Sequence, residues 1–281
     1  MTARTLETVP ASGRNGALRR VAALVIAAGL LASCAHQPVE PPNAPAPTPP
    51  AVSPKPAPAQ PAPASPAAPS AAAAAPAGFP SARYAPGAEQ GGRVYEIAPA
   101  ESQLDILVYR AGRLQRFGHN HIVTSRDVRG FAFDAKDASR SHFDLWFPVD
   151  TLSVDEPELR AAEGDAFSSQ PTESDIAGTR KNMLSEQMLN SAQFPYVTIG
   201  GRTTGGLPDA PTLDLTITVR GIAHAIPATA KVERDGDTLR ATGEVRLSHA
   251  ALGLEPFSVL GGALSVEDAF DVRYRITAHA R

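Results

Sequence analysis

The sequence of 281 residues contains a single cysteine, Cys34, so that no internal disulfide can form. It also lacks a surplus of basic residues. The formal net charge is −3, and the part from Gly92 onward carries 20 basic and 26 acidic residues. A nucleic-acid-binding domain usually has the opposite balance or a dense basic face, so we expect no nucleic-acid partner. Without disulfides, a folded domain of this chain depends on packing and hydrogen bonds alone.

Near the N-terminus there is no apolar run long enough for a membrane-spanning helix, which needs about 20 residues. The run Val21–Leu31 has 11 residues and follows Arg19 and Arg20. This order is typical of a signal peptide. The alternative is a buried core helix, but a proline-rich segment follows at once and offers nothing to pack against.

The apolar run ends in Leu31-Ala32-Ser33-Cys34, which resembles the lipobox of bacterial lipoproteins. The resemblance implies cleavage before Cys34, acylation of Cys34 by palmitate or a similar chain, and anchoring in a membrane. Ala35 follows the cysteine in place of an aspartate, and by the sorting habit of such lipoproteins this implies the outer membrane, facing the periplasm. The lipid anchor is the membrane partner that we expect.

Composition divides the chain into three parts. Residues 1–33 are the predicted signal peptide. Residues 34–91 hold the lipidated cysteine and a stretch dominated by proline and alanine, which we interpret as a disordered linker because it cannot bury enough apolar surface to fold. Residues 92–281 are long enough for one sizeable core and form the predicted domain.

Apolar and polar residues alternate through much of this domain, as expected for half-buried strands. The clearest examples are the segments 143–149, 213–219 and 272–278, and Asp235-Gly236 is a hairpin signal. Only Ser174–Asn190 has helical spacing, with Ser174 as the expected N-cap, and over Glu156–Thr172 we expect a loop, with a helical turn as the alternative. The pattern predicts an all-β fold, namely an antiparallel eight-stranded barrel with one short helical insertion.

Five segments in order resemble the YceI family of lipid- and polyisoprenoid-binding envelope proteins, which have a lipocalin-like barrel. The segments are 94–97, 128–131, 183–199, 213–221 and 248–268, and the likeness covers about residues 94–279. The resemblance implies an isoprenoid chain, such as a quinone tail or polyprenyl lipid, as the ligand. The sequence departs from the family pattern at Phe117–His121, where plainer members carry one histidine, and at Glu156–Asp175, which is longer than usual.

His119 and His121 are the most distinctive local feature. At positions i and i+2 of a strand they face the same side. They can be structural, contact a ligand headgroup, since imidazole can donate a hydrogen bond from either nitrogen, or begin a metal site, which would need further ligands. Candidates for those further ligands are Asp127, His142, His224 and His249.

Other candidate features are weaker. Phe117 and Trp146 are candidate ligand contacts, although an aromatic residue in a strand more often belongs to the core. The acidic run Asp150, Asp155, Glu156 and Glu158 is interpreted as a solvated loop. No catalytic residue is assigned, because there is no Gly-x-Ser-x-Gly motif and no spacing that indicates a triad.

The sequence therefore predicts an envelope lipoprotein that binds an extended apolar ligand inside a β-barrel, with Phe117, His119, His121 and Trp146 as ligand contacts. We expect a binding protein rather than an enzyme, and no cofactor beyond a bound isoprenoid lipid. Two alternatives stay open. One is a metal-dependent enzyme or redox accessory that uses His119 and His121, and the other is a purely structural envelope protein with a filled core.

Overall fold

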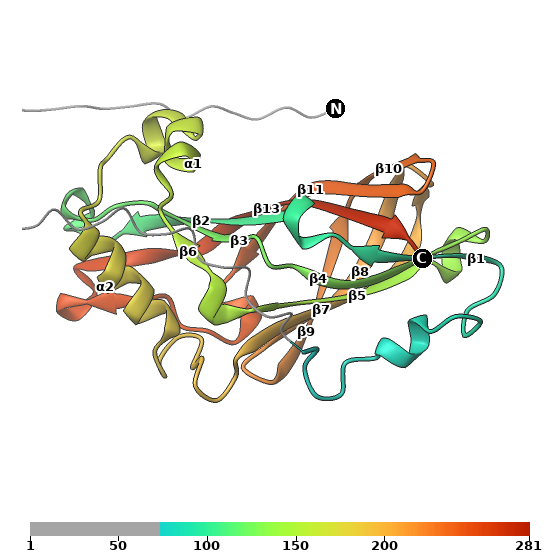
Figure 1. The fold of residues 1–281 in the computed structure, drawn as a ribbon. Coiled ribbons are helices and arrows are strands. Elements are labelled where there is room, and N and C mark those ends of the chain that lie inside the picture. The colour runs from blue at the N-terminus through green and yellow to red at the C-terminus, as the bar shows by residue number, and fades with distance from the viewer. Residues whose placement is uncertain (1–73) are drawn as a thin grey trace, which may run out of the picture. The chain divides into compact units, whose positions relative to one another are not determined.

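A computed structural model describes residues 74–281 (Figure 1). The predicted signal peptide and Cys34 lie outside these residues. Within the described part, no helix is both long and apolar enough to cross a membrane.

Strands dominate the described chain, and every pair of neighbouring strands is antiparallel. The strands are β1 (Gly92–Ile97), β2 (Gln103–Ala111), β3 (His121–Ser125), β4 (Arg129–Ala135), β5 (His142–Pro148), β6 (Ser153–Val154), β7 (Tyr196–Leu207), β8 (Ala210–Val219), β9 (Ile222–Thr229), β10 (Lys231–Asp235), β11 (Thr238–Ser248), β12 (Ser258–Val259) and β13 (Leu264–Ala280). The prediction of an all-β class is confirmed.

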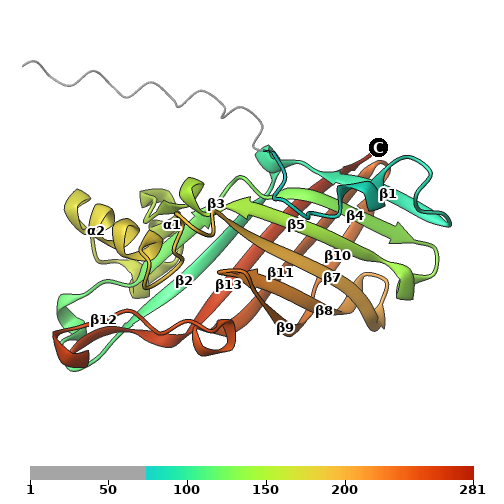
Figure 2. The ribbon, with the colours of Figure 1, turned by 90° about the horizontal axis from the view of Figure 1, so that it is seen from below.

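Some rows of the sheet consist of two shorter strands placed end to end. β1 and β2 pair with successive parts of β13, while β4 and β3 pair with β1 and β2. β5 and β6 form the next row, in which β5 pairs with β4 and β6 pairs with β3. β9 and β10 form another row, in which β9 pairs with β8 and β10 pairs with β11. Because β11 pairs with β13, the described sheet closes on itself, as Figure 2 shows. The closed sheet has eight rows, with β12 added to the end of β13.

The alternating segments place their apolar residues inside the barrel. In β8 each of the residues Leu213, Leu215, Ile217 and Val219 is buried, as predicted, whereas the intervening positions are exposed or half-buried. The turn predicted at Asp235-Gly236 joins β10 to β11, although Asp235 still pairs with Thr238 and the two turn residues are Gly236 and Asp237. A closed sheet has no long free edge, which is one way for a protein without disulfides to avoid pairing between chains.

Two helices interrupt the sheet between β6 and β7, where one was predicted. α1 (Pro157–Ala162) lies in the segment expected to be a loop or to contain a helical turn, and α2 is Glu173–Leu184. The prediction of Ser174 as N-cap is wrong. Thr172 caps α2 instead, because its hydroxyl accepts from the Asp175 backbone N–H while the Asp175 side chain accepts from the Thr172 backbone N–H.

The folded part begins before Gly92. Tyr84, in the short 3-10 helix η1 (Ser81–Tyr84), is only 1% exposed, and its hydroxyl donates to the Asp144 carboxylate at 2.7 Å. Its ring stacks on Phe131, and the ring of Phe79 meets Trp146 edge-on. The predicted linker boundary at Gly91 therefore lies too late in the chain. Residues before it belong to the folded part, because their aromatic side chains cover the outer face of β4 and β5.

Candidate functional site: an apolar cavity with a polar rim

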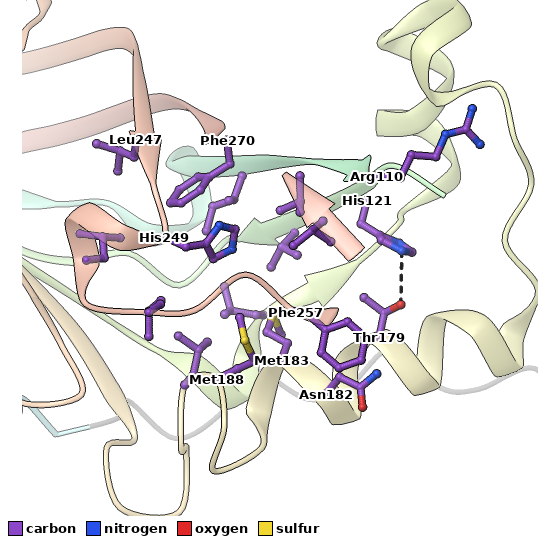
Figure 3. A pocket seen from close by; sticks show the side chains of 18 of the residues that line it. Arg110, His121, Thr179, Asn182, Met183, Met188, Leu247, His249, Phe257 and Phe270 are labelled. Carbon is purple, nitrogen blue, oxygen red and sulfur yellow. Dashed lines mark hydrogen bonds between the residues drawn. The ribbon is translucent and has the colours of Figure 1, made fainter. Parts of the chain in front are cut away.

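The barrel encloses a cavity of about 470 Å³ at the end where α2 lies (Figure 3). Strands on several sides of the barrel contribute apolar side chains to it, and α2 and the turn after it add two methionines. The lining includes Ile106, Val108, Val123, Phe147, Met183, Met188, Leu189, Val197, Leu252, Leu254, Phe257 and Phe270. Methionine side chains are flexible and adapt to irregular apolar ligands.

A second apolar cavity of about 190 Å³ occupies the other half of the barrel. Five residues line both cavities, which therefore adjoin; these are Leu104, Ile199, Ile217, Leu247 and Val272. The interior thus holds two adjoining apolar spaces, and the polar groups described next lie around the larger cavity.

His121 is held in place by a buried carboxylate. Its Nδ1 lies 2.6 Å from Oδ2 of Asp155, and its Nε2 lies 3.5 Å from the hydroxyl of Thr179 on α2. Asp155 directly follows β6, and its backbone N–H donates to the carbonyl of Ile122. This pairing brings the carboxylate beside His121, at the first residue of β3. Figure 3 shows His121 and Thr179 facing each other at the cavity.

The Asp155 carboxylate is itself fully buried and has three partners. It accepts from the Ile122 backbone N–H at 3.0 Å and from the Arg160 guanidinium at 2.6 Å, in addition to His121. Burial alone would raise the pKa of this carboxyl. The hydrogen bonds from His121 and Ile122, the positive charge of a protonated His121 and the hydrogen bond from Arg160 outweigh burial and hold the pKa below its usual value.

The other histidines at the cavity have different surroundings. The His119 ring lies 6.2 Å from the His121 ring, and its Nε2 is 3.8 Å from Asp175. The His119 Nδ1 is buried and has no hydrogen-bond partner among the described residues. His249 bonds through Nδ1 to the backbone carbonyl of Asp268 and packs on the ring of Phe270.

Within residues 74–281 no cluster of three or more histidine, cysteine or acidic side chains is arranged to hold a metal ion. Of the candidate third ligands, Asp127 binds Arg129, and His142 lies between the Arg140 carbonyl and Glu89. His224 lies against Gly253. Only His249 shares the cavity with the pair.

The structure places three of the four predicted contact residues at this cavity. His119 and His121 line it, and Phe117 lies at its rim with 65% of its surface exposed. Trp146 does not line it. This residue is 3% exposed and points to the outer face of β5, where Phe79 and Tyr196 cover it. A ligand contact by Trp146 is therefore not supported by its position.

Sequence reasoning missed Asp155, Thr179 and Asn182. The interpretation of Asp155 as part of a solvated loop is wrong, because its carboxylate is buried between His121 and Arg160. No local signal distinguishes it from its acidic neighbours, since its partners come from β3 and α1. Thr179 and Asn182, at i and i+3 of α2, share a helix face, but the sequence does not show that this face meets the cavity.

The described chain thus forms an antiparallel barrel around an apolar cavity with a few polar groups at its rim. The family model of the YceI-like domain matches residues 95–278, and the chain therefore belongs to the YceI-like family. Membership supports a role in binding apolar lipid ligands and a place in the cell envelope. A comparison with curated proteins finds no match.

Two solved structures illustrate the likeness. Burkholderia cenocepacia BcnA is 10% identical, with a TM-score of 0.47, and the match covers 64% of this chain and 98% of BcnA. The YCEI protein of Campylobacter jejuni is 9% identical, with a TM-score of 0.39, and the match covers 55% of this chain and 82% of that protein.

Proposed function

We propose that this protein binds one extended, single-headed apolar lipid, of the polyprenol or isoprenoid quinol class, inside the barrel. The observation that carries the proposal is the pair of adjoining apolar cavities with polar side chains gathered around one of them. Burial of an apolar tail supplies affinity at about 25 cal/mol per Å² but little orientation. A small number of polar groups in an otherwise apolar site supplies that orientation.

The arrangement around His121 favours a headgroup that donates a hydrogen bond. Nδ1 of His121 lies 2.6 Å from the Asp155 carboxylate, which accepts its proton when the ring is the neutral Nδ1–H tautomer. In that tautomer Nε2 carries a lone pair, which faces Thr179. A ligand hydroxyl can donate to this lone pair and accept from the Thr179 hydroxyl or the Asn182 amide. A quinone carbonyl or an ester cannot donate, so these headgroups suit the neutral ring less well.

His121→Ala is expected to weaken binding of a polyprenol by about 1–3 kcal/mol, because the buried hydroxyl of the ligand loses its partner. The measurement is a titration of the purified protein with a polyprenol and with its methyl ether, which has the same tail but no hydroxyl proton. Wild type should prefer the alcohol, and His121→Ala should lose that preference. His279→Ala is the matched control, since His279 is exposed and binds Glu101 away from the cavity.

Three results would contradict this assignment. Equal affinity of wild type and His121→Ala, with a lower melting temperature, would make the histidine structural. Stoichiometric zinc or copper that is lost on substitution would favour a metal site. A wild type that binds alcohol and ether equally would remove His121 as the headgroup acceptor while leaving the apolar cavity intact.

The proposal extends to the cell envelope through Cys34, outside the described residues. Cys34→Ser is expected to abolish acylation, because the thiol is the acceptor of the lipid in the lipobox that residues 31–34 resemble. Mass spectrometry of the membrane-extracted protein should show acyl chains on wild type and none on the variant. Acyl chains on Cys34→Ser would refute the lipoprotein assignment, and retention of an uncleaved form at the membrane would not rescue it.

A further inference from the structure

Two loops at the end of the barrel that holds the larger cavity expose large apolar side chains. Phe117, in the 3-10 helix η3 (Gln115–Phe117) between β2 and β3, is 65% exposed. Leu260, in η8 (Leu260–Gly262) between β12 and β13, is 70% exposed, and the neighbouring Val259 is also exposed. These three residues are referred to below as the apolar rim.

The two loops form one surface. The backbone N–H of Leu114 donates to the carbonyl of Ala263 at 2.7 Å, which ties the β2–β3 loop to the β12–β13 hairpin. Ala111, the last residue of β2, pairs with Ser265 of β13. In Figure 2 β12 and the end of β2 lie together, at the end of the barrel that also carries α2. The apolar rim is thus held at a defined place beside the cavity that Phe117 lines.

Leu260 is unfavourable for the folded domain in two ways. Its side chain is exposed, and its backbone has φ of 53°, in the left-handed region that glycine and asparagine adopt readily and that a bulky aliphatic residue rarely adopts. Gly261 and Gly262, which follow it, also have positive φ. Strained backbone of this kind clusters at functional sites, which points to a role for the exposed side chain of Leu260.

Basic residues accompany the apolar rim. Arg113 and Arg116 are exposed, and the Arg116 guanidinium lies 4.6 Å from the centre of the Phe117 ring. Arg110 lies at the cavity and donates to the carbonyl of Gly118. None of these three arginines takes part in the ion pairs found among residues 74–281. Exposed acidic residues flank the hairpin as well, namely Glu255 before β12 and Glu267 and Asp268 on β13.

We propose that the apolar rim is a docking surface for an anionic lipid bilayer. Phe117 and Leu260 insert at the level of the headgroups, and Arg113 and Arg116 meet lipid phosphates. Separate apolar tips accompanied by cations suit a fluid anionic surface better than the flat, continuous patch of a protein interface. Docking in this orientation sets the larger cavity next to the bilayer. The inference rests on the loops, and it holds whether or not the cavity binds a lipid.

A tryptophan placed in the apolar rim tests the proposal in the full chain, because quenching of its fluorescence by brominated lipid reports insertion of the rim itself. The protein has one native tryptophan, Trp146, which is buried and serves as an internal reference. Phe117→Trp is compared with Leu207→Trp, since Leu207 is 66% exposed in the β7–β8 hairpin and lines only the second cavity. With vesicles of brominated phosphatidylglycerol, insertion predicts at least about threefold stronger quenching for Phe117→Trp than for Leu207→Trp.

Two further variants in the Phe117→Trp background separate the apolar and electrostatic parts. Leu260→Asn should reduce the quenching at least about threefold, because the aliphatic contact that Leu260 makes with the bilayer is lost. It should melt no lower than its parent, because asparagine tolerates the left-handed backbone. Arg113→Gln with Arg116→Gln should remove the preference for phosphatidylglycerol over phosphatidylcholine vesicles.

Several outcomes would overturn the proposal. Equal quenching of Phe117→Trp and Leu207→Trp, or no quenching of either, would show that the rim does not enter the bilayer. Quenching that is unchanged by the arginine substitutions would rule out an anionic surface as the specific partner. A blue-shifted emission of Phe117→Trp without vesicles, together with a doubled mass in solution, would identify the rim as an interface between two copies of the chain.

Discussion

Asp155→Ala is expected to lower the free energy of unfolding by about 3–5 kcal/mol, because it removes one partner of a buried ion pair and strands the other. Arg160 is buried, and its remaining hydrogen bonds go to neutral oxygens, among them the carbonyls of Asn120 and Phe167. His121 also loses the acceptor for its Nδ1. Urea denaturation of wild type and variant measures the difference. Asp150→Ala, an exposed member of the same acidic run, is the control and should change stability by less than about 0.5 kcal/mol.

The contribution of Asp155 should also depend on pH. Asp155→Asn retains a side chain that tolerates the positive φ of this position but removes the charge. Because the folded-state pKa of Asp155 is depressed, its ionic contribution is fully present above the unfolded pKa of about 3.9 and is lost as pH falls through the lower folded value. The difference between wild type and Asp155→Asn should therefore shrink between pH 7 and about pH 3. An equal difference at both pH values would show that shape, not charge, is responsible.

Ile199→Trp is expected to weaken binding of a long-chain polyprenol roughly 100-fold, which is about 2.8 kcal/mol. Ile199 lines both cavities, so a bulky ring at this position narrows the interior of the barrel where they adjoin. The tail of a long ligand then loses the apolar surface of the second cavity. A short-chain alcohol that fits into the larger cavity should bind almost as before. Titrations with a series of chain lengths measure this effect.

The matched control is Ile222→Trp, which makes the same substitution at an exposed position outside both cavities. It should leave the affinity for every chain length unchanged. If Ile199→Trp weakens short and long chains equally, the substitution disturbs the larger cavity itself. If it weakens neither, the ligand does not extend past Ile199, and the second cavity has no part in binding.

The outward position of Trp146 follows from the alternation of apolar residues along β5. Phe147 and Leu145 have the opposite parity along β5 and point into the barrel, so that Trp146 must point outward. The same alternation argues against a place in the cavity. The burial of Trp146 on the outer face could not be read from the strand, because it depends on Phe79, from a segment that composition assigned to the linker.

The sequence by itself determined the barrel and its family, since strand alternation and turn residues are local and each strand carries its own pattern of inward and outward positions. It also indicated the pair His119 and His121, although the reason given, a shared strand face, is wrong, because β3 begins at His121 and His119 precedes it. Only the tertiary structure decided what His121 can do. Its Nδ1 bonds to Asp155, 34 residues away in the chain, and its Nε2 faces Thr179, 58 residues away on α2. Contacts of this kind depend on how the closed sheet brings β3, the end of β6 and α2 together, and no local pattern records that arrangement.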